Sequence, residues 1–336
     1  MTQQTRPSAG AGAILELGTA FCTARCVLTA VDLDLFTVLE GAPATAAELG
    51  DQLGLHPRGV PAFLDVLVEL GLLQHSAGTY RNDPAATRHL VSGRSGDVTG
   101  FLRRSTHMLW PAWTRFDEML RTGKPTAEAD YTEMIKDPAK LRRFLGMMDA
   151  LNGLLAPELA EAFDWSGRGT VLDVGGARGN LVGNLVKLRP HLRGMVFDLP
   201  QMADPFAEHM AALELTGKVT FHSGSFFDNP LPRADVVCIG HVLHDWAEDE
   251  CRAVVAKAFE AVNPGGALLV YDRMLRADGR RLPNLVISLD MMLTTPGGQE
   301  YPAAEYEQWL AGAGFQDISA RPLGEDDTLV VGHKPR

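Results

Sequence analysis

The chain contains little cysteine and no metal-binding arrangement of it. Four cysteines occur in 336 residues, and they form neither a CxxC pair nor the His/Cys spacing of a zinc site. We therefore expect no structural metal. The thiols are predicted to be reduced and partly buried, as in a cytosolic protein.

Positive charge is also scarce. Lys and Arg total 31 against 42 Asp and Glu, which gives a formal net charge of −11. A sequence-independent interaction with nucleic acid or with an anionic membrane needs the opposite balance. Neither is expected as a partner.

The N-terminal stretch lacks a clean apolar run. Glu16 and Arg25 interrupt the one candidate stretch, and no basic segment precedes it. We therefore expect neither a signal peptide nor a membrane span, and a cytoplasmic location. Aromatic residues reach only 7%, yet the hydrophobic content of 46% is ordinary for a globular protein. The length suggests two domains, or one large domain with a smaller one.

Residues 1–97 have the pattern of a winged helix. Apolar residues recur at helical spacing over 12–40, and Thr45 followed by Glu48 forms a capping box for a short helix. A second helix is predicted over 57–70, followed by two short strands joined by a turn at 76–78.

A winged helix raises the alternative of DNA binding through a recognition helix. Residues 35–90 carry three arginines against six acids, a net charge of −3 by this count. Phosphate would repel such a surface. Packing between protein chains, with the formation of a homodimer, is the favoured interpretation.

Residues 98–165 are predicted to be helical and to connect the two ends of the chain. They carry an unusual concentration of aromatic and methionine residues, namely Phe101, Met108, Trp110, Trp113, Phe116, Met119, Phe144, Met147 and Met148. The cluster is either a core between domains or the lining of an apolar pocket for a planar ligand, which Met and Trp suit.

Strands and helices alternate over residues 166–336. Apolar strands are predicted over 170–176, 193–200, 219–227, 234–240 and 267–275, with helices between most of them. This order predicts an α/β fold with a parallel, doubly wound sheet. Such sheets bind ligands at the carboxyl ends of their strands.

The first strand ends in a glycine-rich turn that does not fit the NAD fingerprint. Ala177 and Asn180 occupy two of the three glycine positions of G-x-G-x-x-G. Asp198 ends the second strand, where an acid can hold ribose hydroxyls, and Ser225 and Phe226 end the third, where they could frame an adenine. S-adenosylmethionine is the nucleoside that best fits these strand ends.

At this point the chain resembles the S-adenosylmethionine-dependent small-molecule O-methyltransferases of plant phenolic and bacterial antibiotic metabolism. Nearly the whole chain takes part, through the motifs VLDVGGARGN (171–180), VFDLP (196–200), HSGSFF (222–227), HVLHDW (241–246), NPGGALLVYD (263–272), PGGQEYPAAEY (296–306) and AGAGF (311–315). The resemblance implies a Rossmann-like methyltransferase domain preceded by a mostly helical, winged-helix dimerisation domain.

The resemblance also implies roles for individual residues. His244 matches the general base, with Asp272 and Glu300 as the acids beside it. The cofactor would be bound by Asn152, Asp173, Gly175, Asp198, Leu199, Ser225, Phe226, Gly240 and His241. A small aromatic substrate would contact Trp110, Met147, Met148, Asp245, Met291 and Thr295.

Four positions depart from the family pattern. Ala177 replaces a glycine, and Ser225 stands where Asp is usual. Gly240 replaces a frequent lysine, and Asp272 replaces the more common Glu. These changes affect the polar contacts to the cofactor and to the base, whereas the expected fold is unaffected.

The segment GHVLHDW (240–246) concentrates the chemistry. Alone, two histidines and an aspartate could hold a metal, but no third-ligand set stands out in the sequence. In the family context His244 would deprotonate a phenolic or polyketide-like hydroxyl. N- or C-methylation of an aromatic acceptor, and a non-methyl reaction such as hydroxylation on the same scaffold, remain alternatives.

Overall fold

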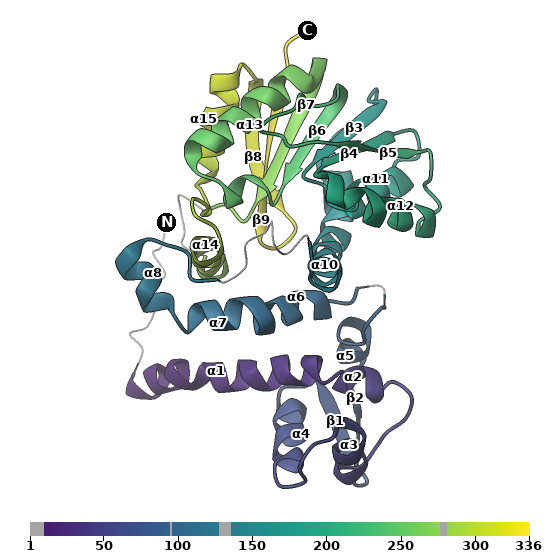
Figure 1. The fold of residues 1–336 in the computed structure, drawn as a ribbon, viewed down its shortest axis with the longest axis vertical. Helices are drawn as coiled ribbons and strands as arrows, with labels where there is room; N and C mark the ends of the chain where they lie inside the picture. Colours follow the sequence, from purple (N-terminus) through teal and green to yellow (C-terminus); the bar gives the residue numbers. More distant parts are fainter. Residues whose placement is uncertain (1–9, 95, 128–135, 276–280) are drawn as a thin grey trace. The chain divides into compact units, whose positions relative to one another are not determined.

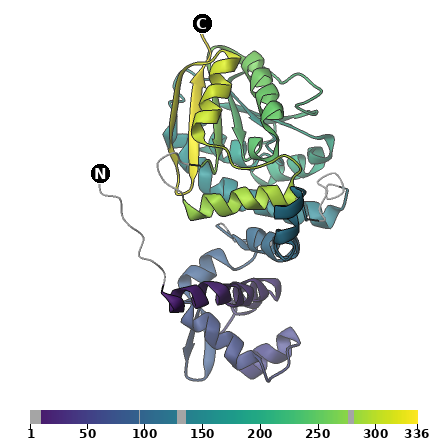
Figure 2. The same ribbon diagram turned by 90° about the vertical axis from the view of Figure 1, so that its left-hand side faces the viewer.

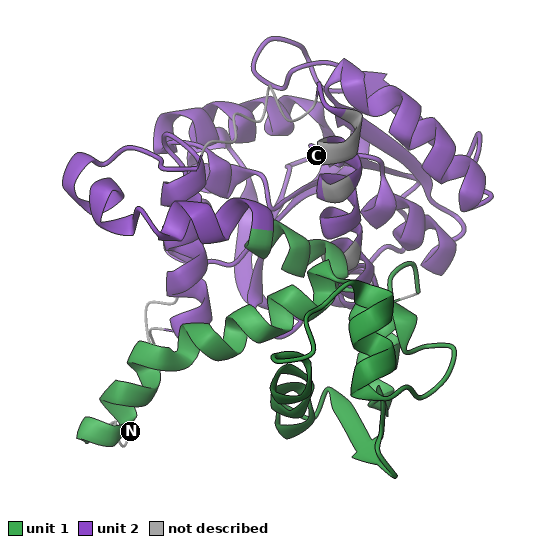
Figure 3. Cartoon of the chain, turned by 60° about the horizontal axis from the view of Figure 1, so that its bottom comes forward, with its two compact units in different colours: residues 1–106 green, residues 107–336 purple. Residues whose placement is uncertain are grey.

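The computed structural model describes residues 10–94, 96–127, 136–275 and 281–336. The chain divides into two compact units, residues 1–106 and 107–336 (Figure 3). Each unit has hydrophobic clusters of its own.

The N-terminal unit is helical with one hairpin (Figure 1). Its elements are α1 (Ala11–Asp32), α2 (Leu35–Val38), α3 (Ala46–Leu53), α4 (Val60–Glu69), β1 (Leu73–Ser76), β2 (Thr79–Asn82), α5 (Pro84–His89) and α6 (Thr99–Arg104). The strands β1 and β2 pair antiparallel, with Leu73 opposite Asn82. The predicted helices and hairpin of a winged helix are therefore confirmed.

Local sequence signals explain where these helices begin and end. The Thr45 hydroxyl accepts a hydrogen bond from the Glu48 amide, and the Glu48 carboxylate accepts one from the Thr45 amide, which completes the capping box. Gly54 ends α3 in the left-handed conformation. Helix α4 begins at Val60, later than the predicted 57, because residues 57–59 form a turn in front of it.

Helix α1 presents an apolar surface that its own unit leaves exposed. Ile14, Leu15, Leu17 and Phe21 are each more than half exposed. Among the described helices, α1 alone has the length and apolar composition that would suffice to cross a membrane, a criterion that a helix covered by protein also meets. Its exposed side chains require a covering surface.

The C-terminal unit is built around a seven-stranded sheet with the order β5-β4-β3-β6-β7-β9-β8. The strands are β3 (Thr170–Val174), β4 (Arg193–Asp198), β5 (Val219–Ser223), β6 (Ala234–Gly240), β7 (Val262–Asp272), β8 (Gln316–Leu323) and β9 (Asp327–His333). The pairs from β5 to β7 are parallel. Strand β3 lies between β4 and β6, which makes its carboxyl end the switch point where ligands bind in such sheets.

Helices cover both faces of this sheet (Figures 1 and 2). One face packs against α10 (Pro138–Ala162), α11 (Asn180–Leu188) and α12 (Ala203–Ala212), and the other against α13 (Glu248–Ala261) and α15 (Ala303–Ala313). Among the described residues of this unit, the other helices are α7 (Trp110–Trp113), α8 (Phe116–Thr122) and α14 (Leu282–Thr294), together with the short turns η2 (Pro200–Met202) and η3 (Leu243–Asp245). The π-helical turn η1 (Ser105–Leu109) spans the boundary between the units.

The sheet differs from the sequence expectation at its C-terminal edge. Strand β9 runs antiparallel to β7, and β8 pairs antiparallel with β9. Neither strand was predicted, so the expected all-parallel sheet is wrong at this edge. Strand β7 also begins at Val262 rather than 267, because the Pro-Gly-Gly segment continues the strand with an irregular register.

Candidate functional site

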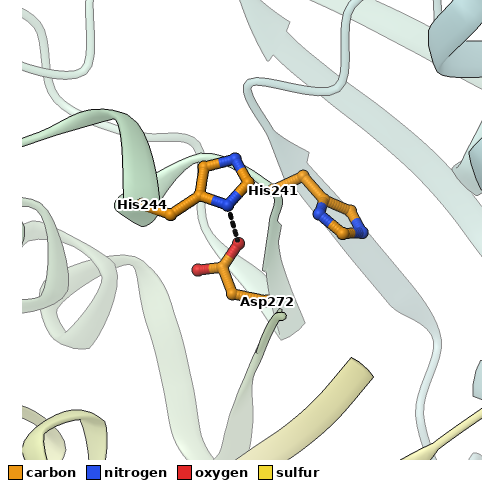
Figure 4. A group of neighbouring side chains, drawn as sticks. All are labelled: His241, His244 and Asp272. Atoms are coloured by element: carbon orange, nitrogen blue, oxygen red, sulfur yellow. Dashed lines mark ion pairs between the residues drawn. The ribbon is translucent and has the colours of Figure 1, made fainter. Parts of the chain in front are cut away.

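The turn after β6 places two histidines at the carboxyl end of the sheet. His241 follows the last residue of β6, and His244 lies in the turn η3 (Figure 4). Both side chains are buried, and their ring centroids are 5.6 Å apart. The two rings differ in their partners.

His244 contacts the two acids that the sequence predicted. Its Nδ1 lies 2.8 Å from Glu300 Oε1 and 3.4 Å from Asp272 Oδ1. Glu300 precedes α15, and Asp272 ends β7. When the Nδ1–H group donates to these carboxylates, Nε2 carries the lone pair that can accept a proton. The arrangement is that of an oriented general base.

Two further side chains hold these acids, and the sequence did not single them out. The Tyr306 hydroxyl on α15 donates to Asp272 Oδ2 at 2.9 Å. The Glu300 amide donates to Ser288 Oγ on α14 at 3.1 Å. Both acids are almost completely buried. The two acids beside His244 are thus anchored to two helices, Asp272 by a bond from Tyr306 on α15 and Glu300 by a bond to Ser288 on α14.

The acids make His244 a stronger base than free histidine. Burial alone would lower the pKa of its imidazole, but the negative charges of Asp272 and Glu300 outweigh burial and raise the pKa to about 10. The pKa of His244 is thereby close to that of a phenol, which is about 10.

His241 lies in a different environment. Its Nε2 is 3.3 Å from Asp327 Oδ1, at the start of β9, and its ring meets Tyr271 edge-on. Burial, and then the neighbouring His244 and Arg273, hold the pKa of His241 well below its usual range. The structure thus shows His241 against a carboxylate; its predicted contact with the cofactor stays a prediction.

His241, His244 and Asp272 could together offer three atoms to a metal ion (Figure 4). These atoms lie within 4.8 Å of one another. However, His244 Nδ1 already contacts Glu300, and His241 Nε2 faces Asp327. The contacts favour two imidazole–carboxylate pairs over a shared metal.

The glycine-rich turn after β3 is shaped by unusual backbone angles. Gly175, Ala177 and Gly179 all have positive φ, of 71°, 49° and 79°. A side chain at Gly175 would also lie 2.7 Å from Val242 in the turn after β6. Ala177 therefore keeps the backbone shape of the glycine that it replaces, at the cost of strain.

Asp198 ties this turn to the end of β4. Its Oδ2 accepts a hydrogen bond from the Ala177 amide at 2.7 Å, and its Oδ1 accepts one from the Leu199 amide at 2.6 Å. Burial raises the pKa of Asp198 to about 6, and burial together with the charge of Asp198 raises that of Asp173 to about 8. Two buried acids beside a glycine turn fit a ligand that brings hydroxyl donors and a cationic group.

The other predicted cofactor residues lie at neighbouring strand ends. Ser225 and Phe226 follow β5, and the Ser225 hydroxyl accepts a hydrogen bond from the Phe227 amide at 3.2 Å. Phe226 packs edge-on against Phe227 and Trp246. Asn152 is buried on α10, and Gly240 ends β6. The strand ends predicted for a nucleoside are thus brought to one edge of the sheet.

The residues predicted to contact the acceptor come from three helices, from the turn η3 and from the loop after α14. Trp110 lies on α7, Met147 and Met148 on α10, and Met291 on α14, with Thr295 just after α14 and Asp245 beside His244. The Thr295 hydroxyl donates to the Met291 carbonyl and accepts from the Gly298 amide. Thr295 therefore shapes the loop that leads to Glu300, and its contact with an acceptor stays a prediction.

One buried acid near these helices escaped the sequence reading. Asp290 Oδ1 on α14 accepts a hydrogen bond from Trp113 Nε1 at 2.6 Å. Its neighbour Met291 was predicted to contact the acceptor. Asp290 stands in no motif, and nothing in the sequence indicates that this acid points inward from its helix. Asp290 links α14 to the aromatic helix α7.

The doubly wound sheet and the polar groups at its strand ends are those of a nucleoside-binding fold, and comparisons with known proteins name its family. Residues 119–316 match the O-methyltransferase domain, and residues 15–92 match the O-methyltransferase dimerisation domain. The chain belongs to this O-methyltransferase family and is an S-adenosylmethionine-dependent methyltransferase.

Individual relatives are similar over nearly their full lengths. The 8-O-methyltransferase TcmO of tetracenomycin polyketide synthesis from Streptomyces glaucescens is 46% identical, covering 97% of this chain and 98% of the relative. The N,N-dimethyltransferase OxyT from Streptomyces rimosus is 36% identical and covers 99% of both chains. The structure of mitomycin 7-O-methyltransferase MmcR is 26% identical, with a TM-score of 0.84 over 97% of both chains. Human N-acetylserotonin methyltransferase, solved with S-adenosylmethionine, shares the fold with a TM-score of 0.90 at 24% identity, over 99% of this chain and 100% of that one.

Proposed function

We propose that the protein methylates a phenolic hydroxyl of a small, polyketide-like aromatic compound, with His244 as the general base. The observation that carries the proposal is the buried His244 ring, whose Nδ1 is held 2.8 Å from Glu300 and 3.4 Å from Asp272. This contact leaves Nε2 to take a proton. The similarity to an 8-O-methyltransferase of polyketide synthesis supports the acceptor class.

The chain's own residues account for the proton. S-adenosylmethionine supplies an electrophilic methyl group on a positively charged sulfur. His244 accepts the hydroxyl proton as the oxygen attacks, and Asp272 and Glu300 stabilise the imidazolium that forms. Base catalysis of this kind contributes roughly 10²–10⁴-fold, and the alignment of the acceptor supplies much of the remainder.

The remaining assigned residues would hold the two ligands. Asp198 would accept hydrogen bonds from the ribose, and Gly175 and Asp173 would lie at the methionine end. Ser225, Phe226 and Leu199 would lie beside the adenosine part. Trp110, Met147, Met148 and Met291 would form the apolar walls around an aromatic acceptor.

N-methylation is the second candidate, because a relative that is 36% identical is an N,N-dimethyltransferase. An amine that is neutral at the moment of attack needs the same in-line geometry. It needs the base only to remove a proton from the ammonium form or from the product. The cluster around His244 is therefore compatible with both acceptor atoms, and the product has to decide between them.

Product analysis tests the proposal. The protein is incubated with a panel of polyphenolic and aminated aromatic polyketides and with S-adenosylmethionine carrying a labelled methyl group. A mass gain of 14 plus the mass of the label, with the label on oxygen, supports the proposal, whereas the label on nitrogen or carbon establishes the alternative transfer. A gain of 16 without label would show hydroxylation and contradict it.

We also propose that the exposed apolar face of α1 is covered by a second copy of the chain. The support is the match of residues 15–92 to a dimerisation domain, which includes most of this helix. Replacing both Leu15 and Leu17 with Glu is expected to lower the mass measured by light scattering from dimer to monomer. Three further expectations stay predictions. They are a cytoplasmic location, the absence of nucleic-acid and membrane partners, and the division of the chain into domains at residues 97 and 165.

A further inference from the structure

A tyrosine side chain occupies the space that a side chain at Gly240 would need. Gly240, at the end of β6, and Tyr271, on β7, are partners in the parallel register of the two strands. A Cβ built on Gly240 would overlap Cζ and Oη of Tyr271. The phenol of Tyr271 therefore lies across the end of β6, and among the amino acids glycine alone leaves room for it.

This crossing directs the phenol toward β3. Because β6 lies between β7 and β3 in the sheet, a side chain that crosses β6 from β7 approaches the end of β3. Asp173 is on β3, opposite Cys238 of β6. Burial, and after it the charge of Asp173, raises the pKa of Tyr271 well above its usual range, which agrees with this direction. The hydroxyl thus lies on the side of the sheet edge where the glycine turn begins.

The Tyr271 hydroxyl lacks the partner that buried tyrosines ordinarily have. Tyr271 is 1% exposed, and no hydrogen bond joins its hydroxyl to another of the described residues. By contrast, the other buried tyrosines in the described parts of the chain all donate: Tyr80 to Asp65, Tyr301 to the Trp246 carbonyl and Tyr306 to Asp272. The Tyr271 oxygen is also not one of the fully enclosed polar atoms without a partner, so it keeps an accessible surface at which a ligand can supply the missing hydrogen bond.

We propose that the Tyr271 hydroxyl binds the methionine end of S-adenosylmethionine, by donating a hydrogen bond to its carboxylate next to Asp173. The inference rests on the proposed placement of the cofactor at the glycine turn. Tyr271 supplies from β7 the polar contact that Gly240, which has no side chain, does not supply from β6. Asp173 is the matching acid for the ammonium group of the same methionine end.

The hydroxyl can be separated from the ring experimentally. Tyr271→Phe keeps the aromatic ring that packs in the core with Leu269 and Cys238, and removes the donor alone. Calorimetry with S-adenosylhomocysteine is expected to give a dissociation constant roughly ten- to a hundredfold higher than for the wild type, the effect of losing a hydrogen bond to a charged group. The control Tyr80→Phe, in the N-terminal unit, is expected to leave this constant unchanged.

A shortened ligand distinguishes a direct contact from a general loosening of the site. 5′-Methylthioadenosine has the nucleoside and the sulfur but no amino-acid end. Tyr271→Phe is expected to bind it as tightly as the wild type does. Equal affinity of both proteins for S-adenosylhomocysteine, or an equal loss for both ligands, would overturn the inference. Failure of the wild type to bind S-adenosylhomocysteine would instead overturn the proposed function.

The close packing of the Tyr271 phenol against Gly240 can be tested separately. Gly240→Ala places a methyl group into the phenol and is expected to lower both the melting temperature and the affinity for S-adenosylhomocysteine. Gly240→Ala with Tyr271→Leu makes room for that methyl group. The double variant should regain melting temperature relative to Gly240→Ala without regaining affinity. If the two substitutions act additively on melting temperature, the two positions do not interlock.

Discussion

The two sides of the turn after β6 show how one short segment can hold two histidines of opposite character. His244 and His241 are three residues apart and similarly buried. His244 faces Asp272 and Glu300 through Nδ1 and Asp245 through Nε2, and its pKa is raised to about 10. His241 faces Asp327, and its pKa is lowered well below the usual range. Burial is common to both, so the neighbouring charges decide the difference.

The charges around His244 and His241 also explain how each ring is protonated. The acids around His244 stabilise the imidazolium that forms when Nε2 takes up a proton, and that charge disfavours a second one on His241, 5.6 Å away. The Asp327 carboxylate lies near two basic side chains, those of His241 and Arg273. One histidine therefore binds a proton readily, as the proposed base must, whereas the other stays neutral beside a carboxylate.

Removing the imidazole of His244 should have the largest effect. His244→Ala is expected to lower kcat by roughly 10²–10⁴-fold, the usual contribution of a general base, while the dissociation constant for S-adenosylhomocysteine stays the same. Steady-state kinetics and calorimetry measure the two quantities. His191→Ala removes a histidine that contacts the Trp165 carbonyl and should leave both unchanged. Turnover of His244→Ala near the wild-type value would refute the assignment of the base.

Weakening the acids should move the pH profile. Glu300→Gln removes a charge that raises the pKa of His244. The free base then exists at lower pH, and the rising limb of kcat/KM against pH should shift down by about one unit or more.

The shift of the His244 pKa in the folded protein also affects stability. The contribution of the His244–acid cluster is fully present below the unfolded pKa of 6.5 and is lost as pH rises toward 10, so Glu300→Gln should lose melting temperature mainly at neutral and lower pH. An unshifted profile would show that Glu300 does not act through His244.

Changing His241 should affect stability more than catalysis. His241→Phe keeps a ring beside Tyr271 but removes the imidazole next to Asp327, whose other neighbour is Arg273, at a cost of about 1 kcal/mol in the free energy of unfolding. Denaturant titration measures this loss. His241→Asn, which retains an N–H donor and tolerates a positive φ, should lose less. If His241→Phe shifted the pH profile as Glu300→Gln does, the two histidines would not have separate functions.

The smallest expected effect concerns the second strained position near the site. His241 and Ala177 both have positive φ without being glycine, at 53° and 49°. Ala177→Gly relieves this strain and should change the free energy of unfolding by about 1 kcal/mol or less in the stabilising direction. Chemical denaturation checks the sign. A destabilised Ala177→Gly would mean that the Ala177 methyl group, which is buried with Met202, contributes more than the strain costs.

The sequence predicted those site residues to which the family resemblance assigns a role. The His244–Asp272–Glu300 cluster was predicted from three separate motifs because the resemblance placed them at one sheet edge, and the capping box at Thr45 was predicted from local spacing. Tyr271 and Asp327 escaped. Their importance depends on the register of β6 against β7 and on the antiparallel strand β9, which no spacing along the chain encodes. Tyr306 escaped because its hydroxyl acts through Asp272 rather than on a ligand.

The order of the site along the chain has a consequence for protein engineering. The glycine turn and the acids beside it lie between residues 173 and 226, and the base with its supporting groups lies between 240 and 306. The predicted acceptor walls come chiefly from α7 and α10, which precede both segments. A laboratory that wishes to redirect this enzyme to another acceptor can therefore diversify codons 110–148 while leaving the machinery for proton transfer and nucleoside binding in unaltered DNA.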